Sequence, residues 1–158
     1  MALLDRIDRK LLDLLQQDAS LPLAELARRV HLSPTPCWRR VQKLQASGVI
    51  RKQVVLLDAG KVNAGVTVFV SVKTNQHNAA WLERFAQGVQ EIPEVVEFYR
   101  MSGDTDYLLR IVVPDIQGYD AVYKKLIRTA ELFDISSSFA MEQLKYTTAL
   151  PLNFAEMR

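Results

Sequence analysis

The sequence predicts an α+β protein with two domains: an N-terminal winged helix-turn-helix domain and a C-terminal ferredoxin-like βαββαβ sandwich. Apolar residues recur at helical spacing through the first 50 residues, whereas alternation with a period of two appears from residue 66 onward. The 158 residues are 49% hydrophobic and 24% charged, which is enough apolar material for two small cores. The expected division is a helix-turn-helix domain over residues 1–52, a linker strand over 53–63, and a second domain over 64–158.

Two helices are expected in the first 30 residues. The first carries an apolar stripe with polar residues on its other faces, consisting of Leu4, Ile7, Leu11, Leu14 and Leu15. The second is short and begins near Pro22, and its stripe consists of Leu23, Leu26, Ala27 and Val30. His31-Leu32 then makes a tight connection, so a third helix is expected to follow at once.

The third helix has clear start and stop signals. Ser33 is the expected N-cap, with its hydroxyl accepting from a backbone amide, and Pro34 suits the first helical position. The helix is expected to run to about residue 47, with Gly48 in the left-handed conformation after it. Two helices joined by a few residues, the second of them well capped, make a helix-turn-helix candidate. The basic turn 49–52 and the apolar run 54–57 then suggest a wing and its strand.

The second half predicts the order β-α-β-β-α-β. Val66 to Val72 alternates as a strand, residues 78–90 have a helical stripe, and residues 95–100 and 107–113 are strands around a turn. A helix follows from Pro114-Asp115, and residues 135–148 are strand-like. This order is typical of a split βαβ sandwich with both helices on one face of an antiparallel sheet.

Charge is unevenly distributed. Residues 1–60 carry ten Lys/Arg and six Asp/Glu, whereas the remainder carries ten and twelve. Between Glu25 and Asp58 there are seven basic residues and no acid. Such a cationic region attracts phosphate backbones, although a merely solvated basic face is an alternative that charge alone leaves open.

The third helix is the candidate DNA reader. With Cys37, Val41 and Leu44 facing the core, its other side is expected to present basic residues, and arginine can bind guanine or phosphate while lysine suits phosphate. Trp38 and Cys37 are interpreted as packing residues. The expected DNA contacts are Ser33, Thr35, Pro36, Arg39, Arg40 and Lys43 on the helix, and Arg51 and Lys52 at the wing.

A second candidate site is the turn from Ser102 to Tyr107. Gly103 suggests positive φ, Asp104 and Asp106 can accept hydrogen bonds from an amino group, and the turn amides can hold a carboxylate. A run of hydroxyls, Ser136, Ser137 and Ser138, lies near the last strand. On the residues alone, a plain hairpin turn with solvated acids is favoured over a ligand site.

Other classes of protein are disfavoured. The chain has no apolar run of the roughly 20 residues that a membrane helix needs, and one cysteine cannot form an internal disulfide, so we expect a cytoplasmic protein without membrane contact. There is no glycine-rich phosphate loop, no metal-ligand spacing and no catalytic constellation. The sequence therefore predicts no enzyme, metal or cofactor.

The motifs now described resemble the Lrp/AsnC family of leucine-responsive-type bacterial regulators along nearly the whole chain. The most specific match is residues 32–41, Leu-Ser-Pro-Thr-Pro-Cys-Trp-Arg-Arg-Val, with Leu44 and residues 48–50. Residues 7–12 and the 103–109 segment, Gly-Asp-Thr-Asp-Tyr-Leu-Leu, are also typical. Residues 36–38 and 137–148 resemble the DecR cysteine-detoxification subgroup.

The resemblance implies a transcription regulator that binds double-stranded operator DNA. It implies a homodimer that assembles into octamers or other higher forms through a second domain used for effector binding and oligomerisation. It places an amino-acid effector, with cysteine as the candidate, at contacts between dimers near the 103–107 turn, which reverses the preference for a plain hairpin. The residues carried over are Met101, Ser102, Gly103, Asp104, Asp106 and Tyr107, with Ser136 to Ser138. The alternatives are an architectural DNA-binding protein without an effector and, less favoured, an enzyme subunit with an allosteric module.

Overall fold

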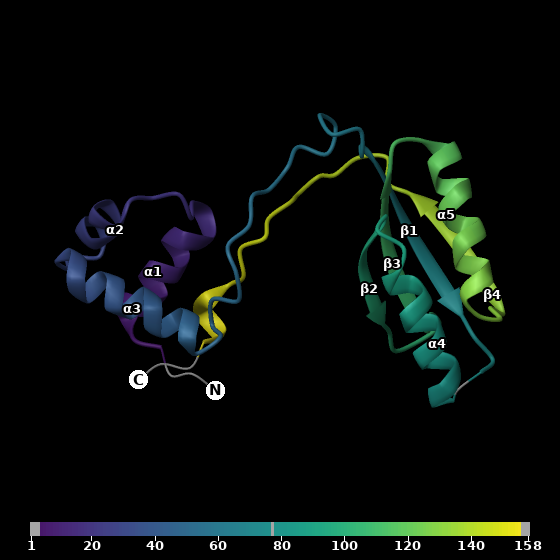
Figure 1. The fold of residues 1–158 in the computed structure, drawn as a ribbon, viewed down its shortest axis with the longest axis horizontal. Helices are drawn as coiled ribbons and strands as arrows, with labels where there is room; N and C mark the ends of the chain where they lie inside the picture. Colours follow the sequence, from purple (N-terminus) through teal and green to yellow (C-terminus); the bar gives the residue numbers. More distant parts are fainter. Residues whose placement is uncertain (1–3, 77, 156–158) are drawn as a thin grey trace. The chain divides into compact units, whose positions relative to one another are not determined.

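A computed structural model describes residues 4–76 and 78–155 and divides the chain into two compact units (Figure 1). One unit combines the first 55 residues with the segment from Lys145 onward, and the other covers Leu56–Leu144. The second unit begins and ends inside the chain, so two connections join it to the first. No helix among the described residues is long and apolar enough to cross a membrane.

The first unit contains the three expected helices, α1 (Arg6–Gln17), α2 (Leu23–Arg29) and α3 (Pro34–Ala46). Their shared core is built from the predicted stripes, since Leu11, Leu26 and Cys37 are buried together. The turn between α2 and α3 requires His31 at φ 57°, the left-handed conformation, and the Leu32 amide donates to the Ala27 carbonyl oxygen at 2.9 Å. The helix-turn-helix is thereby confirmed.

The ends of α3 lie where the sequence predicts them. Ser33 is the N-cap and Gly48 has φ 75° beyond the last turn. The Ser33 hydroxyl, however, makes no capping bond. An N-cap oxygen usually accepts from the amide of the second or third helical residue. Here the third helical residue is Pro36, which has no N–H, so one of the two usual donors to the N-cap oxygen is missing.

The C-terminal segment belongs to the first unit, which differs from the sequence-based assignment of residues 64–158 to one domain. Leu152 and Ala155 pack against a small core of Leu4, Leu12 and Leu44. This segment includes a short 3-10 helix, η1 (Leu152–Phe154). The expected linker strand over 53–63 and its wing are also absent, because residues 51–58 have no regular structure and turns follow.

The second unit is a four-stranded antiparallel sheet in the order β2-β3-β1-β4. The strands are β1 (Val66–Lys73), β2 (Val95–Arg100), β3 (Tyr107–Val113) and β4 (Asp134–Phe139), and the helices are α4 (Ala79–Gln90) and α5 (Ile116–Thr129). This is the predicted ferredoxin-like order. β4 ends at Phe139 rather than near residue 148. Phe139 pairs with Val68, and the Ala140 amide still donates to the Thr67 carbonyl oxygen at 2.9 Å. β1 begins at Val66, so it has no residues to pair with a strand that continued to 148.

One face of the sheet carries the core and the other is uncovered. Val68, Val70 and Val72 of β1 have no exposed surface and pack with residues of α4 and α5, including Trp81, Phe85 and Leu126. Figure 1 shows the two helices of this unit beside the sheet. On the opposite face, Phe69 and Tyr99 remain 39% and 50% exposed, which leaves an apolar surface available for a further layer.

Candidate DNA-binding and effector sites

The outward face of α3 is cationic. Thr35, Pro36, Arg39 and Lys43 are all exposed, opposite the buried Cys37 and Leu44. Arg39 and Lys43 form no ion pair within the part of the chain that the structure describes. Both side chains are therefore available to an external anion.

Four further basic residues of this unit fall into two kinds, those with an acidic partner and those without one among the described residues. Arg51 and Lys52 are exposed after α3 and have no acidic partner among residues 4–76 and 78–155. Arg28 and Arg29 instead both bind Glu25, at 2.7 Å and 2.6 Å. The hydrogen bonds from Arg28 and Arg29 lower the pKa of Glu25 to about 2, so the pair of arginines is already half neutralised within α2.

Arg40 lies where the sequence does not predict it. It was expected on the free face beside Arg39, but it comes one turn after Cys37 and its guanidinium faces α1. Nη1 donates to Asp5 Oδ2 at 2.5 Å and to Asp8 Oδ1 at 2.7 Å. Helical spacing explains this placement, because residues three apart lie on neighbouring parts of a helix surface and Arg40 therefore flanks the buried side.

The N-terminus of α3 offers polar groups that have no partner among the residues that the structure describes. Of its first three residues, only Thr35 has an N–H, because the other two are Pro34 and Pro36. The Cys37 amide donates to the Ser33 carbonyl oxygen at 3.2 Å. The Thr35 amide and the Ser33 hydroxyl are thus the groups that this helix end presents to an anion.

Cys37 and Trp38 are adjacent in α3, but one is buried and the other is exposed. Cys37 is fully buried, and burial raises the pKa of its thiol, so it is the protonated core residue that the sequence predicts. Trp38 was expected to pack but is 50% exposed. The indole follows Cys37 by one position, which turns it away from the core, and it borders the cationic face.

The turn between β2 and β3 is closed by its own backbone. The Met101 amide donates to the Asp106 carbonyl oxygen at 2.8 Å, and Gly103 has φ 105°. Ser102 and Asp104 are exposed, and Asp104 makes no hydrogen bond or ion pair in the described chain. Gly103 therefore supplies the conformation that the turn needs, and Asp104 is its free carboxylate.

Asp106 and Tyr107 support the turn from beneath. The Asp106 carboxylate accepts from the Thr74 amide at 2.8 Å, and the Asp106 amide donates to the Val72 carbonyl oxygen at 3.1 Å. Tyr107 is only 6% exposed and packs its ring against Trp81 and Phe85. Contrary to expectation, its side chain is a core residue, because the first position of β3 points toward the helices.

The three serines do not form one group. Ser137 pairs with Val70 in the sheet register and faces the helices, where its hydroxyl is hydrogen bonded to the Tyr119 hydroxyl. Ser136 and Ser138 pair with Ser71 and Phe69 and face the uncovered side. β4 lies at the opposite edge of the sheet from the β2–β3 turn, so one chain does not bring these serines to the turn. Ser137 faces the side opposite to Ser136 and Ser138 because successive side chains of a strand point to opposite faces of the sheet.

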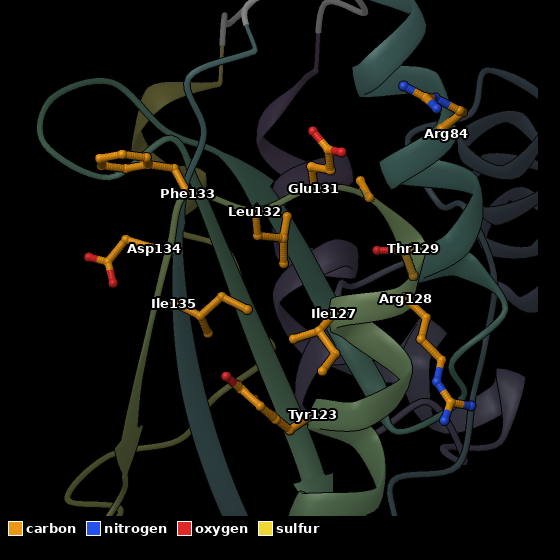
Figure 2. A pocket seen from close by; sticks show the side chains of 11 residues that line it. Arg84, Tyr123, Ile127, Arg128, Thr129, Glu131, Leu132, Phe133, Asp134 and Ile135 are labelled. Carbon is orange, nitrogen blue, oxygen red and sulfur yellow. The ribbon is translucent and has the colours of Figure 1, made fainter.

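A cavity of about 610 Å³ lies where α5 ends and the chain enters β4. Figure 2 shows Ile127, Leu132 and Ile135 facing one another at its centre. The side chains of Arg128, Glu131 and Asp134 point away from that centre (Figure 2). A small-ligand site combines apolar walls with convergent polar groups, whereas the charged side chains labelled here diverge, so we do not assign a ligand to this cavity. No group of His, Cys, Asp or Glu suited to a metal ion occurs among residues 4–76 and 78–155.

A helix-turn-helix unit with a free basic face, joined to an α+β unit with an uncovered sheet, defines a two-domain DNA-binding regulator. Residues 4–45 match the AsnC-type helix-turn-helix domain and residues 67–150 match the Lrp/AsnC ligand binding domain. The chain belongs to the Lrp/AsnC family and is a DNA-binding transcription regulator of that type.

Two curated relatives are equally similar to the chain. The DNA-binding transcriptional activator DecR of Escherichia coli is 50% identical over 151 residues, covering 95% of this chain and 99% of DecR. The glutamate uptake regulatory protein of Zymomonas mobilis is 50% identical over 149 residues, covering 94% and 91%.

Two solved structures share the fold over nearly the full length. An AsnC family transcriptional regulator from Agrobacterium tumefaciens has a TM-score of 0.93 and 62% identity, covering 96% of this chain and 99% of its own. A transcriptional regulator from Neisseria meningitidis, solved as a complex with L-Met, has a TM-score of 0.90 and 37% identity, covering 95% and 97%.

Proposed function

We propose that this regulator binds operator DNA through the exposed face of α3 and responds to a free amino acid at the β2–β3 turn. The observation that carries the first part is that Arg39 and Lys43, opposite the buried side of α3, form no ion pair with any residue that the structure describes. Thr35, Pro36 and the Ser33 hydroxyl border this face, and Arg51 and Lys52 add phosphate contacts. Such DNA binding places the protein in the bacterial cytoplasm.

The amino group of the effector would pair with Asp104, which has no partner among the described residues, while the Ser102 hydroxyl and the turn amides would donate to the effector carboxylate. Met101, 43% exposed, would border the effector side chain. Asp106 and Tyr107 act beneath the turn by holding it to β1 and the core. An amino-acid effector is supported by the L-Met complex of the Neisseria relative. Cysteine is the first candidate, because residues 36–38 and 137–148 resemble the DecR cysteine-detoxification subgroup. Glutamate is the second, because one relative is named a glutamate uptake regulatory protein.

The assembly we propose is a homodimer made by two uncovered sheet faces, with higher forms such as an octamer built from dimers. Phe69 and Tyr99 lie on that face, with Ser136 and Ser138 on β4. A second copy would cover these residues. Because the serines and the turn are at opposite edges in one chain, a site containing both needs two copies.

The test combines DNA selection with a thermal-shift screen. The wild-type protein should select a recurring duplex from a random-sequence pool, whereas Arg39→Gln and Lys43→Gln should weaken binding and each lower the salt slope by about 0.9 if the residue contacts phosphate. Free amino acids, with cysteine kept reduced, should be screened for a rise in melting temperature.

A rise in melting temperature that Asp104→Asn removes would support the turn as the effector site. Glu83→Gln, at an exposed acid on α4, is the control and should leave the rise intact. Selection of no sequence over bulk DNA, with no thermal shift, would favour an architectural DNA-binding protein instead.

A further inference from the structure

Four hydrogen bonds involve the side chains of Asp5, Asp8 and Arg40: two within the start of α1 and two from α3 to α1. Asp5, the N-cap of α1, accepts from the Asp8 amide at 2.8 Å through Oδ1, and Asp8 accepts from the Asp5 amide at 3.2 Å through Oδ2. The second oxygen of each carboxylate accepts from Arg40 Nη1. Each of the four carboxylate oxygens therefore has one donor, and a single nitrogen of α3 joins the two acids of a capping box.

The network depends on its cation. Two carboxylates held side by side by a capping box repel each other, and Arg40 is the positive charge between them. Burial by itself would raise the pKa of Asp5, but the Asp8 amide and the Arg40 guanidinium outweigh it and hold that pKa below its ordinary value. The side chains of Asp8 and Arg40 are 15% and 32% exposed, so the contact is partly shielded from water.

Arg39 and Arg40 are consequently different despite their adjacency. Arg39 is exposed and has no partner among the described residues, while Nη1 of Arg40 is engaged by both acids. Arg39, Lys43 and the three network residues line one shallow hollow of about 270 Å³. The network thus lies directly beside the cationic face of α3.

We infer that Arg40 is a positioning residue: it fixes α3 to the capped start of α1, and thereby aims Arg39 and Lys43, without itself contacting DNA. The inference rests on the proposed DNA binding by α3. It follows from the charge of the cluster, because one guanidinium lies between two carboxylates, and an excess of negative charge there disfavours a phosphate beside Arg40.

The decisive variant is Asp8→Asn, because the two readings predict opposite signs. If α3 contacts DNA with Arg40 included, removing a carboxylate beside the cationic face lessens repulsion and strengthens binding. If Arg40 positions α3, the same change should weaken DNA binding. Both Asp8 oxygens accept a hydrogen bond, one from the Asp5 amide and one from Arg40, and the side chain of Asn has only one oxygen, so one of these two bonds is lost. Asp13→Asn, an exposed acid on the same helix, is the matched control for charge alone.

Affinity is measured against a duplex that the wild-type protein selects from a random-sequence pool, over a range of salt concentrations. We expect Asp8→Asn to weaken binding roughly tenfold, comparable to the loss of one base contact, and Asp13→Asn to leave it equal or stronger. Arg40→Gln should weaken binding without changing the salt slope, whereas Arg39→Gln should lower the slope by about 0.9 if Arg39 contacts phosphate.

Tighter binding by Asp8→Asn, or a salt slope lowered by about 0.9 in Arg40→Gln, would make Arg40 a DNA contact and overturn the inference. Unchanged affinity in Asp8→Asn and Arg40→Gln, with only a lower unfolding midpoint, would reduce the network to a stabilising contact and overturn it as well. Should Arg40→Gln not fold, Asp5→Asn takes its place, because it removes one of the two Arg40 bonds from the other end. Failure of the wild-type protein to bind any duplex would instead refute the proposed function.

Discussion

The side-chain amide of Gln16 holds the backbone of Leu150 at two points. Gln16 Nε2 donates to the Leu150 carbonyl oxygen at 3.2 Å, and the Leu150 amide donates to Gln16 Oε1 at 2.7 Å. The residues are 134 positions apart in the chain. This paired contact directs the C-terminal segment along α1, where Leu152 and Ala155 then close the small core around Leu12 and Leu44.

The C-terminal segment should therefore stabilise the helix-turn-helix unit. Replacing Leu152 by Ala should cost about 1–2 kcal/mol of its unfolding free energy, less than for a fully buried leucine because Leu152 is only partly buried. Phe154→Ala in the same 3-10 helix is the control, since that ring is 79% exposed and should cost little. Amide exchange in α1 and α3 measures the effect; equal exchange in both variants would contradict the role of the segment.

Replacing His31, in the turn between α2 and α3, by glycine should stabilise the helix-turn-helix unit. At φ 57° a residue with a Cβ is disfavoured by roughly 1–2 kcal/mol. Glycine avoids this penalty, but it loses more conformational entropy on folding, so only part of the penalty becomes a gain in stability. We expect His31→Gly to raise the unfolding free energy by about 0.5–1 kcal/mol, whereas His31→Ala, which keeps a Cβ, should bring no gain. Denaturant unfolding compares the two, and a gain in the alanine variant would point to the imidazole instead of the backbone.

The stability of the first unit should fall in acid partly through Asp5. Its pKa is lower in the folded protein than its ordinary value of 3.8, so its stabilising contribution is complete above that value and is lost as pH falls through the folded pKa. Asp5→Asn should flatten the decline in unfolding midpoint between about pH 5 and pH 2. Asp13→Asn, on the same helix, should retain the wild-type slope, and an unchanged slope in Asp5→Asn would assign the acid sensitivity elsewhere.

The sequence predicts most helices and strands because their signals are local. The stripe of Leu11, Leu26 and Cys37 is readable at a spacing of 3.6, and the alternation of β1 at a spacing of two, so the helices and the sheet order were predictable. β4 was predicted too long because the residues after Phe139 keep strand-like composition, while its true end depends on where its pairing with β1 stops, which is a contact distant in sequence.

The sites were predicted less well because they depend on contacts distant in sequence. The Asp5–Arg40 contact spans 35 positions, and nothing local distinguishes Arg40 from Arg39 except the helical angle relative to Cys37. That angle can be calculated from the sequence, and it places residue 40 beside the buried face of α3. Leu150, Leu152 and Phe154 alternate in the sequence, but of these three only Leu152 packs against the core, so the return of the C-terminal segment was not predictable from spacing.

Gly88 in α4 should tolerate no side chain because Thr129 of α5 is too close. A Cβ on Gly88 would lie 2.6 Å from both the Cβ and Cγ2 of Thr129, and the neighbour is a helical residue whose Cβ cannot rotate away. In an open helix, alanine would gain about 1 kcal/mol over glycine, but here the overlap should reverse the sign and destabilise the second unit by about 1–3 kcal/mol. The double variant Gly88→Ala, Thr129→Gly removes the overlap, so its loss should be smaller than the sum of the two single losses, measured by denaturant unfolding. Additive losses would mean that α4 and α5 separate freely at this crossing, and a stabilised Gly88→Ala would mean that helix propensity outweighs the contact.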